Sequence, residues 1–272
     1  MSWFEAIILG IVQGLTEFLP VSSTAHLRIV PAFAGWEDPG ALFTAVIQLG
    51  TMLAVVIFFW RDISRITGTW LASLRRPQLR GELDARMGWY VIVATIPIGV
   101  AGLAFRHQIE NGARNLYVIG TMLIVAGLVL LGAEMVGRRT RGIEEVGRAD
   151  AVWIGIAQAL ALIPGTSRSG ATITAGLFLG MEREAAARFS FLLSIPAIVL
   201  SGLFGLSELL KDNGGVSFGA LAIATIGAFV VGYASIALLL RYLASHSTLV
   251  FVIYRVALGA IVIGLTAGGA IS

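Results

Sequence analysis

The chain has 272 residues, of which 57% are hydrophobic and 13% are charged, and its formal net charge is +3. This composition excludes an ordinary soluble domain and indicates an integral membrane protein. The sequence contains no cysteine, which excludes disulfides, thiolate metal sites and a cysteine nucleophile. The arginines lie in short segments between apolar runs, so the positive charge indicates membrane orientation, and we expect no nucleic-acid partner.

The first element in chain order is a short apolar helix that ends in a polar break within residues 10–26. Pro20 ends the helix, and Ser22, Ser23 and Thr24 follow it. Glu17 cuts the apolar run short. We therefore expect a re-entrant helix-loop segment here and not a complete membrane span.

Six further apolar runs are long enough to cross about 30 Å of hydrocarbon as helices. They are residues 39–60, 87–105, 115–133, 189–207, 213–240 and 249–271. A second polar break, at residues 155–170, lies between the third and fourth runs and repeats the first break. With a one-residue gap, the repeat aligns Gly155 with Gly10, Gln158 with Gln13, Pro164 with Pro20 and Ser167 with Ser23.

The duplicated break predicts the domain organisation. An odd number of spans in each half gives the two halves opposite orientations in the membrane. We expect an all-α polytopic integral membrane protein that forms a single membrane domain, residues 1–272, with six transmembrane helices and two re-entrant segments. Residues 1–137 and 150–272 would be its inverted-topology repeats, and a weaker similarity between residues 92–100 and 222–230 agrees with this division.

The charge of the connecting segments predicts the orientation. The loop from residue 61 to residue 86 contains six arginines, and the segment 138–148 contains four. Both are expected to be cytoplasmic by the positive-inside rule, whereas the 207–216 turn, with Glu208, Lys211 and Asp212, is expected outside. The polar site would then open towards the outer face of the membrane.

Three residues of the first break could carry chemistry. Glu17 lies one helical turn after Gln13, and a carboxylate in apolar surroundings is costly unless it is paired, hydrated or bound to a cation. His26 follows Ser23 by three residues, which is compatible with a base beside a hydroxyl nucleophile. The alternatives are an interfacial carboxylate for Glu17 and a hydrogen-bonded structural histidine for His26.

The second break could bind an anion. Arg168 lies between Ser167 and Ser169, and Gly170 begins a run that can form a helix. A guanidinium, two hydroxyls and the amides of a helix N-terminus together form a phosphate cradle. The alternative for Arg168 is a side chain that reaches a lipid headgroup, and Arg255 in the last apolar run has the same two interpretations.

Four other polar residues are expected to have structural or solvent-exposed positions. Gln48 and Ser190 lie in apolar runs, where hydrogen bonds between helices are the expected role. His107 and His246 lie in predicted loops and are expected to be solvated.

The motifs together resemble those of a known family. Residues Gln13–His26, Pro164–Thr172, Ile47–Thr51 and Phe189–Pro196 are similar to segments of the undecaprenyl-pyrophosphate phosphatases of the bacitracin-resistance type. The resemblance implies hydrolysis of a polyprenyl pyrophosphate carrier lipid to its monophosphate at the outer face of the bacterial inner membrane. It also implies a divalent cation, Mg²⁺ or Ca²⁺, and through carrier recycling a role in cell-wall synthesis and bacitracin resistance.

The resemblance also implies residue roles. Glu17 would be the essential acid and the cation ligand, Ser23 the nucleophile and His26 its acid/base partner. Arg168 would bind the pyrophosphate. Gln13 stands where many members have a second glutamate, so a site with two carboxylates is in doubt. Further substrate contacts are expected from Gln13, Ser22, Thr24, Thr166, Ser167, Ser169, Gly170 and Arg255.

The sequence leaves two alternatives open. Ser23 could attack the terminal phosphorus, or Glu17 and His26 could activate a water. Inverted repeats with broken helices are also transporter architecture, so a transporter or flippase for a polyprenyl phosphate lipid is the competing class. The expected partners are the lipid substrate and membrane lipids, and a homodimer is one expected assembly.

Overall fold

The computed structural model describes residues 1–105, 114–211 and 217–271. The expectations for His107 and for part of the 207–216 turn lie outside these residues. Within them, six helices are long and apolar enough to cross a membrane, which confirms the all-α polytopic fold. These helices are α3 (Gly40–Phe58), α5 (Leu83–Ala104), α7 (Leu116–Val136), α10 (Arg183–Lys211), α11 (Phe218–Leu243) and α12 (Leu249–Ala267).

Shorter helices flank the two polar breaks. The first break joins α1 (Trp3–Phe18) to α2 (Ser23–Ala34), and the second joins α8 (Arg148–Ala159) and the 3-10 turn η3 (Leu160–Leu162) to α9 (Arg168–Phe178). At about 1.5 Å per residue, neither α1 nor α8 reaches across the hydrocarbon. Their re-entrant course stays a prediction with which these lengths are compatible.

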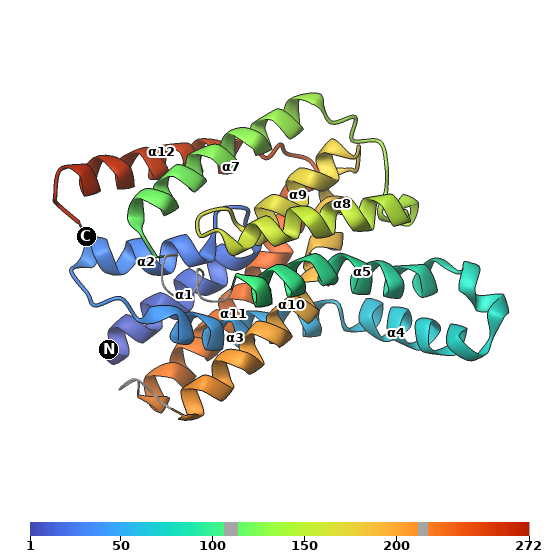
Figure 1. Cartoon of the computed structure of the whole chain (residues 1–272), viewed down its shortest axis with the longest axis horizontal. Coiled ribbons are helices and arrows are strands. Elements are labelled where there is room, and N and C mark those ends of the chain that lie inside the picture. Colours follow the sequence, from blue (N-terminus) through green and yellow to red (C-terminus); the bar gives the residue numbers. More distant parts are fainter. Residues whose placement is uncertain (106–113, 212–216, 272) are drawn as a thin grey trace.

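The arginine-rich segment 61–86, expected as a loop, is mostly helical. It forms α4 (Trp60–Arg75) and the 3-10 turn η1 (Pro77–Gly81), and α4 packs back against α5. Figure 1 shows this hairpin projecting from one end of the molecule. The interpretation as a loop was wrong because α4 is amphipathic, with apolar side chains such as Ile66 on its buried side and charged residues on the other.

Helix packing relates the two halves. Helix α1 packs along α11 and α8 along α5, while α3 packs on α10 and α7 on α12 (Figure 1). A side chain at Gly10 would collide with the backbone of Ala224, and one at Gly155 would collide with the backbone of Ala94. These crossings occupy corresponding positions in the similar segments 92–100 and 222–230. The pattern is compatible with inverted repeats, which remain a prediction.

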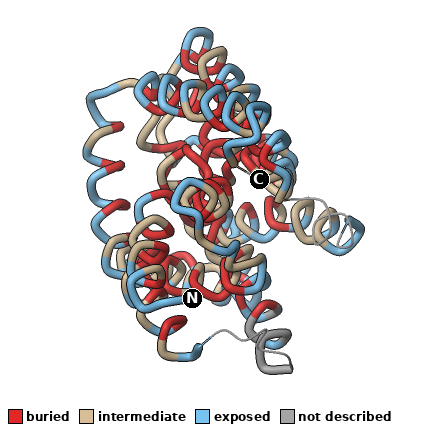
Figure 2. Tube along the Cα trace, turned by 90° about the vertical axis from the view of Figure 1, so that its left-hand side faces the viewer, coloured by how far each residue is buried: buried red, intermediate tan, exposed pale blue. Residues whose placement is uncertain are grey.

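The buried residues lie between the helices, and the outer faces of the spanning helices are apolar. Figure 2 shows the buried positions concentrated inside the bundle and the exposed ones around it. Leu103 on α5, and Ile226 and Leu238 on α11, are more than half exposed. Apolar side chains exposed in this way indicate contact with lipid, so the two polar breaks are enclosed by a membrane-embedded bundle.

Candidate active site

The two breaks have the same backbone conformation. Ser22 and Ser167 have positive φ angles of 74° and 70°, and the next residues, Ser23 and Arg168, begin helices α2 and α9. Positive φ is uncommon for residues other than glycine and costs roughly 1–3 kcal/mol. The structure therefore pairs Ser22 with Ser167, and it corrects the gapped alignment that paired Ser23 with Ser167.

An ion pair joins the two breaks. Arg168 Nη2 lies 2.5 Å from Glu17 Oε1, and Ser23 Oγ donates a 2.6 Å hydrogen bond to Glu17 Oε2. All three side chains are largely removed from solvent. The carboxylate thus holds the guanidinium with one oxygen and the serine hydroxyl with the other, although Glu17 and Arg168 lie in different halves of the chain.

Neighbouring groups fix both members of the ion pair. Arg168 Nη1 donates to the Ser194 carbonyl of α10 at 2.9 Å. Gln13 Nε2 donates to Glu17 Oε2 at 2.9 Å and approaches Thr51 Oγ1 at 3.5 Å. Neither Ser194 nor Thr51 was predicted as part of the site, although both lie in motifs that carried the family resemblance.

The ion pair faces a cavity of about 550 Å³. One part of its lining is polar and comes from the two breaks, and the other is largely apolar and comes from the C-terminal parts of α5 and α10. The polar residues are Glu17, Ser22, Ser23, Thr24, Ser167 and Arg168, and the second part includes Ile98, Gly99, Gly102, Leu103, Ile198, Leu200 and Ser201. The N-termini of α2 and α9 lie at the polar part, which therefore favours an anion. The apolar part favours a hydrocarbon chain.

His26 forms a different pair from the one expected. Its Nε2 lies 2.6 Å from the Tyr254 hydroxyl, and its Nδ1 lies 2.7 Å from the Ser22 carbonyl. The rings of His26 and Tyr254 are parallel, with centroids 5.6 Å apart. Both ring nitrogens therefore have partners other than Ser23. The sequence did not identify Tyr254 as a partner of His26, because the two residues lie 228 positions apart.

Arg255 lies inside the protein and forms no ion pair with a carboxylate among the described residues. Its side chain is fully buried, and it donates at 2.9 Å to the carbonyls of Pro20, Gly165 and Thr166. It also donates to the Leu123 carbonyl at 3.3 Å. The guanidinium therefore ties the first break, the second break and α7 together, an arrangement that neither sequence interpretation included.

The remaining predicted residues lie around this junction, outside the cavity lining. Ser169 Oγ donates to the Leu19 carbonyl at 3.0 Å and lies 3.1 Å from Ser167 Oγ. The Gly170 amide donates to Ser167 Oγ, and a side chain at Gly170 would come within 2.7 Å of the Arg255 guanidinium. Thr166 Oγ1 is buried without a partner in the described structure. Substrate contact by these groups stays a prediction.

Three other polar residues can also be compared with expectation. Thr172 Oγ1 donates to Ser190 Oγ at 2.6 Å, which confirms a hydrogen bond between helices α9 and α10. His246 is exposed, as predicted. Gln48 lines the cavity, and the expected helix–helix hydrogen bond from its side chain is not among those of the described residues.

The fit of a divalent cation rests on one carboxylate. The described residues contain no group of three or more histidine and acidic side chains arranged for a metal. Glu17 is accompanied by Gln13 Oε1, a buried oxygen without a hydrogen-bond partner in the described structure. Mg²⁺ keeps several waters and uses only one or two carboxylates with substrate phosphates. The pair therefore fits a cation that shares its ligands with a bound phosphate.

Fold and site together define a polytopic membrane protein with a buried acid–serine–arginine site beside an apolar cavity. A family model described as bacitracin resistance protein BacA matches residues 6–261. The chain is 53% identical to an undecaprenyl-diphosphatase of Nocardioides sp. and 54% identical to one of Mycolicibacterium smegmatis, in each case over 100% of this chain and 99% of the relative. The chain therefore belongs to the bacitracin resistance protein BacA family.

Proposed function

We propose that the protein hydrolyses undecaprenyl pyrophosphate to undecaprenyl phosphate and inorganic phosphate. The observation that carries this proposal is the contact of Glu17 with both Ser23 and Arg168 in one cavity that continues between apolar residues. The polar end fits a pyrophosphate and the apolar part an isoprenoid chain. The names of the relatives and the family support the same reaction, and the family links it to bacitracin resistance.

The geometry favours Ser23 as the nucleophile and Glu17 as its base. Ser23 Oγ already donates its proton towards Glu17 Oε2 at 2.6 Å, within the range required of a general base. As the bond from Oγ to the terminal phosphorus forms, the bridging P–O bond breaks and undecaprenyl phosphate leaves. Glu17 takes the serine proton. A water then attacks the phosphorus of the phosphoserine as the P–Oγ bond breaks. Glu17 returns its proton to Ser23 Oγ, the water keeps one proton in the inorganic phosphate and releases the other to solvent, and the free serine is restored.

Arg168 neutralises the phosphoryl oxygens in this proposal. Its bond to Ser194 keeps the guanidinium in place while the substrate replaces Glu17 as its partner. This exchange frees a Glu17 oxygen when the anion arrives. A planar guanidinium can bind two phosphate oxygens at once, and the amides at the start of α2 and α9 add positive potential.

A divalent cation would be held by Glu17, with Gln13 Oε1 beside it and phosphate oxygens as further ligands. When bound, Mg²⁺ or Ca²⁺ neutralises charge on the transferred phosphoryl group. His26 is assigned a positioning role in place of direct base catalysis, because both of its nitrogens have other partners. Through the Ser22 carbonyl, it supports the turn that presents Ser23.

Phosphate release tests the proposed function and separates it from transport. The purified protein should release phosphate from undecaprenyl pyrophosphate in detergent, where no transmembrane gradient exists. Ser23→Ala should lower the rate by about 10³-fold or more, since it removes the nucleophile. Ser201→Ala, which removes a hydroxyl from the apolar part of the same cavity, is the matched control. Lipid movement without phosphate release would support the flippase alternative.

The site is proposed to open to the periplasmic side of the bacterial inner membrane. The cavity involves the C-terminal parts of α5 and α10, whereas the arginine-rich segments lie at the opposite ends of these helices. Basic segments stay cytoplasmic, so the cavity would belong to the outer half of the bilayer. A homodimer stays a prediction.

Cysteines placed in this cysteine-free chain test the orientation. Gln78 in η1 and Ser217 before α11 are both exposed. An impermeant maleimide added to intact spheroplasts should label Ser217→Cys, and it should label Gln78→Cys only after the membrane is permeabilised. The reverse pattern would contradict the proposed orientation without affecting the proposed reaction.

A further inference from the structure

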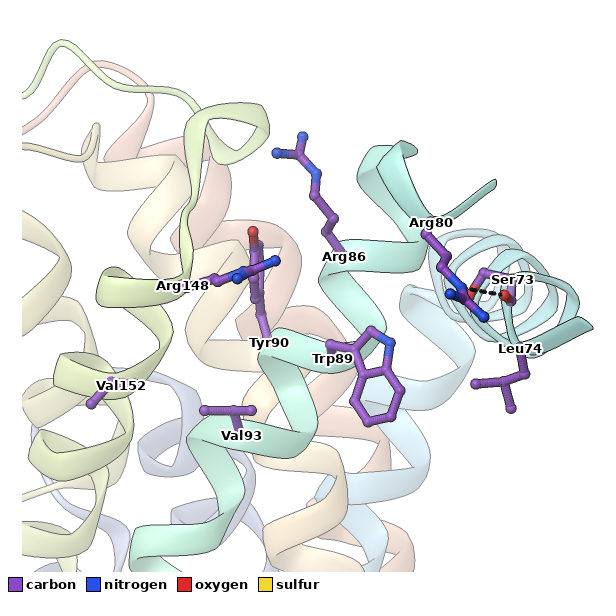
Figure 3. Close-up of a pocket in the computed structure, with 9 residues that line it drawn as sticks. All are labelled: Ser73, Leu74, Arg80, Arg86, Trp89, Tyr90, Val93, Arg148 and Val152. Atoms are coloured by element: carbon purple, nitrogen blue, oxygen red, sulfur yellow. Dashed lines mark hydrogen bonds between the residues drawn. The ribbon is translucent and has the colours of Figure 1, made fainter. Parts of the chain in front are cut away.

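A second cavity lies at the arginine-rich end of the molecule and shares no lining residue with the cavity of the proposed active site. It has a volume of about 600 Å³ and is formed by the α4–α5 hairpin and the N-terminal part of α8. Its lining residues are Ser73, Leu74, Arg80, Arg86, Trp89, Tyr90, Val93, Arg148 and Val152. Figure 3 shows these side chains. No residue of this cavity belongs to the proposed active site.

The charge at this cavity has no acidic partner among the residues that the structure describes. Arg86 and Arg148 are exposed, and neither forms an ion pair with a carboxylate among the described residues. Neighbouring arginines are paired: Arg65 binds Asp62 and Asp84, and Arg141 binds Asp150 at 2.6 Å. The cavity lining contains arginine but no acidic side chain, so an anion is the complementary ligand.

The cavity is also layered. In the view of Figure 3, Arg86 and the Arg148 guanidinium are drawn above Val93, Val152 and the Trp89 indole. Trp89 packs edge-on against Trp70 of α4, with ring centroids 5.6 Å apart. Tryptophan and tyrosine mark the membrane–water interface. The arginines therefore lie on the headgroup side of the interface, and the valines lie on the hydrocarbon side.

We propose that this cavity binds an anionic glycerophospholipid of the cytoplasmic leaflet, such as phosphatidylglycerol. Its phosphodiester would lie between Arg86 and Arg148, and its acyl chains would lie along Val93, Val152 and Trp89. Basic pockets between transmembrane helices on the cytoplasmic side are suited to anionic headgroups. The order of charged, aromatic and apolar side chains in this cavity matches the order of chemical groups along such a lipid.

Native mass spectrometry of the full-length protein in detergent tests this site with phosphatidylglycerol as the probe and phosphatidylcholine as the zwitterionic comparison. One phosphatidylglycerol should bind more tightly than phosphatidylcholine. Arg86→Gln with Arg148→Gln should raise the Kd for phosphatidylglycerol by about 25-fold, because each basic group near the membrane surface contributes about 1 kcal/mol. Equal binding of the two lipids to the wild-type protein would overturn the proposal.

Arg75→Gln with Arg76→Gln is the matched control, because it removes the same charge from exposed positions of the same hairpin outside the cavity. The Kd of this control for phosphatidylglycerol should stay near the wild-type value. An equal rise in its Kd would mean that binding depends on the general surface charge and would overturn the proposed site. Both double variants should retain phosphate release, which verifies folding. If the first pair does not fold, Arg148→Gln alone, at an exposed position, should raise the Kd by about fivefold.

A substitution in the apolar part distinguishes a lipid from free phosphate. Val152 is 42% exposed, so Val152→Trp can fill the cavity without displacing the core. It should weaken phosphatidylglycerol binding while all the arginines remain. Unchanged lipid binding in this variant, together with displacement of the lipid by inorganic phosphate, would mean that the cavity binds only a phosphate group and would overturn the lipid assignment.

Discussion

The two polar breaks share a backbone but differ in the side chain that the backbone presents. In each, a serine with positive φ precedes a helix, and the first helical residue is Ser23 in one break and Arg168 in the other. The same turn thus presents a hydroxyl in the first half and a cation in the second. Glu17 contacts both side chains, so the site is complete only where the two halves meet.

Loss of the Glu17 carboxylate should have the largest effect, because this group contacts a side chain from each break. Glu17→Gln keeps the side-chain shape, but it removes the proposed base for Ser23 and the charged partner of Arg168. Phosphate release should fall by about 10³-fold or more. Glu5→Gln, at a half-buried position in the first turn of α1, is the control because it changes the same side chain outside the cavity. Retention of most activity by Glu17→Gln would exclude Glu17 as the base.

The second break is tested by a substitution that keeps the positive charge of the Arg168 side chain and changes its shape. Arg168→Lys retains a positive charge, but an ammonium cannot bond Glu17 and Ser194 as the planar guanidinium does. We expect turnover to fall by about 10²-fold, with normal membrane insertion. Arg188→Lys, at a partly exposed i,i+4 ion pair with Glu184, provides the control. Near-normal turnover in Arg168→Lys would show that only charge is needed there.

Sequence alone predicted the six spans, the two breaks and the grouping of Glu17, Ser23 and Arg168. Long apolar runs and polar interruptions can be read locally, because the thickness of the bilayer sets the length of a span and a polar side chain in hydrocarbon is costly. The positions that were missed depend on distant partners. The contact of His26 with Tyr254 and the carbonyl contacts of Arg255 join residues more than 80 positions apart. The spacing of residues along the sequence cannot predict such contacts.

The alignment of the breaks shows a related limit. Matching Pro20 with Pro164 required a gap, which paired Ser23 with Ser167. The backbone instead pairs Ser22 with Ser167, because the positive φ and the start of the following helix coincide there. Residue identity was therefore a poorer guide to equivalence than conformation, and conformation became visible only in three dimensions.

Arg255 tests whether the breaks must be held together. Arg255→Lys keeps the buried charge but cannot reach the Pro20, Gly165 and Thr166 carbonyls at once. Buried carbonyls left without donors cost about 1–3 kcal/mol each, so the temperature of thermal inactivation should fall. The kcat should fall by about tenfold with a smaller change in KM. Arg241→Lys, at an exposed position near the end of α11, is the control. An unchanged kcat in a destabilised Arg255→Lys protein would limit Arg255 to a role in folding.

The smallest expected effect concerns Gln13, the position where the family resemblance implies a second glutamate in many members. Gln13 donates to Glu17, and its own oxygen has no partner in the described structure. Gln13→Glu places a second carboxylate beside the first, which should lower the Mg²⁺ concentration needed for half-maximal phosphate release by about tenfold. Gln48→Glu adds the same charge elsewhere on the cavity wall and should change the Mg²⁺ requirement less. An equal shift in both variants would indicate a general effect of cavity charge, whereas no shift in Gln13→Glu would leave Gln13 as a hydrogen-bond partner that only orients Glu17.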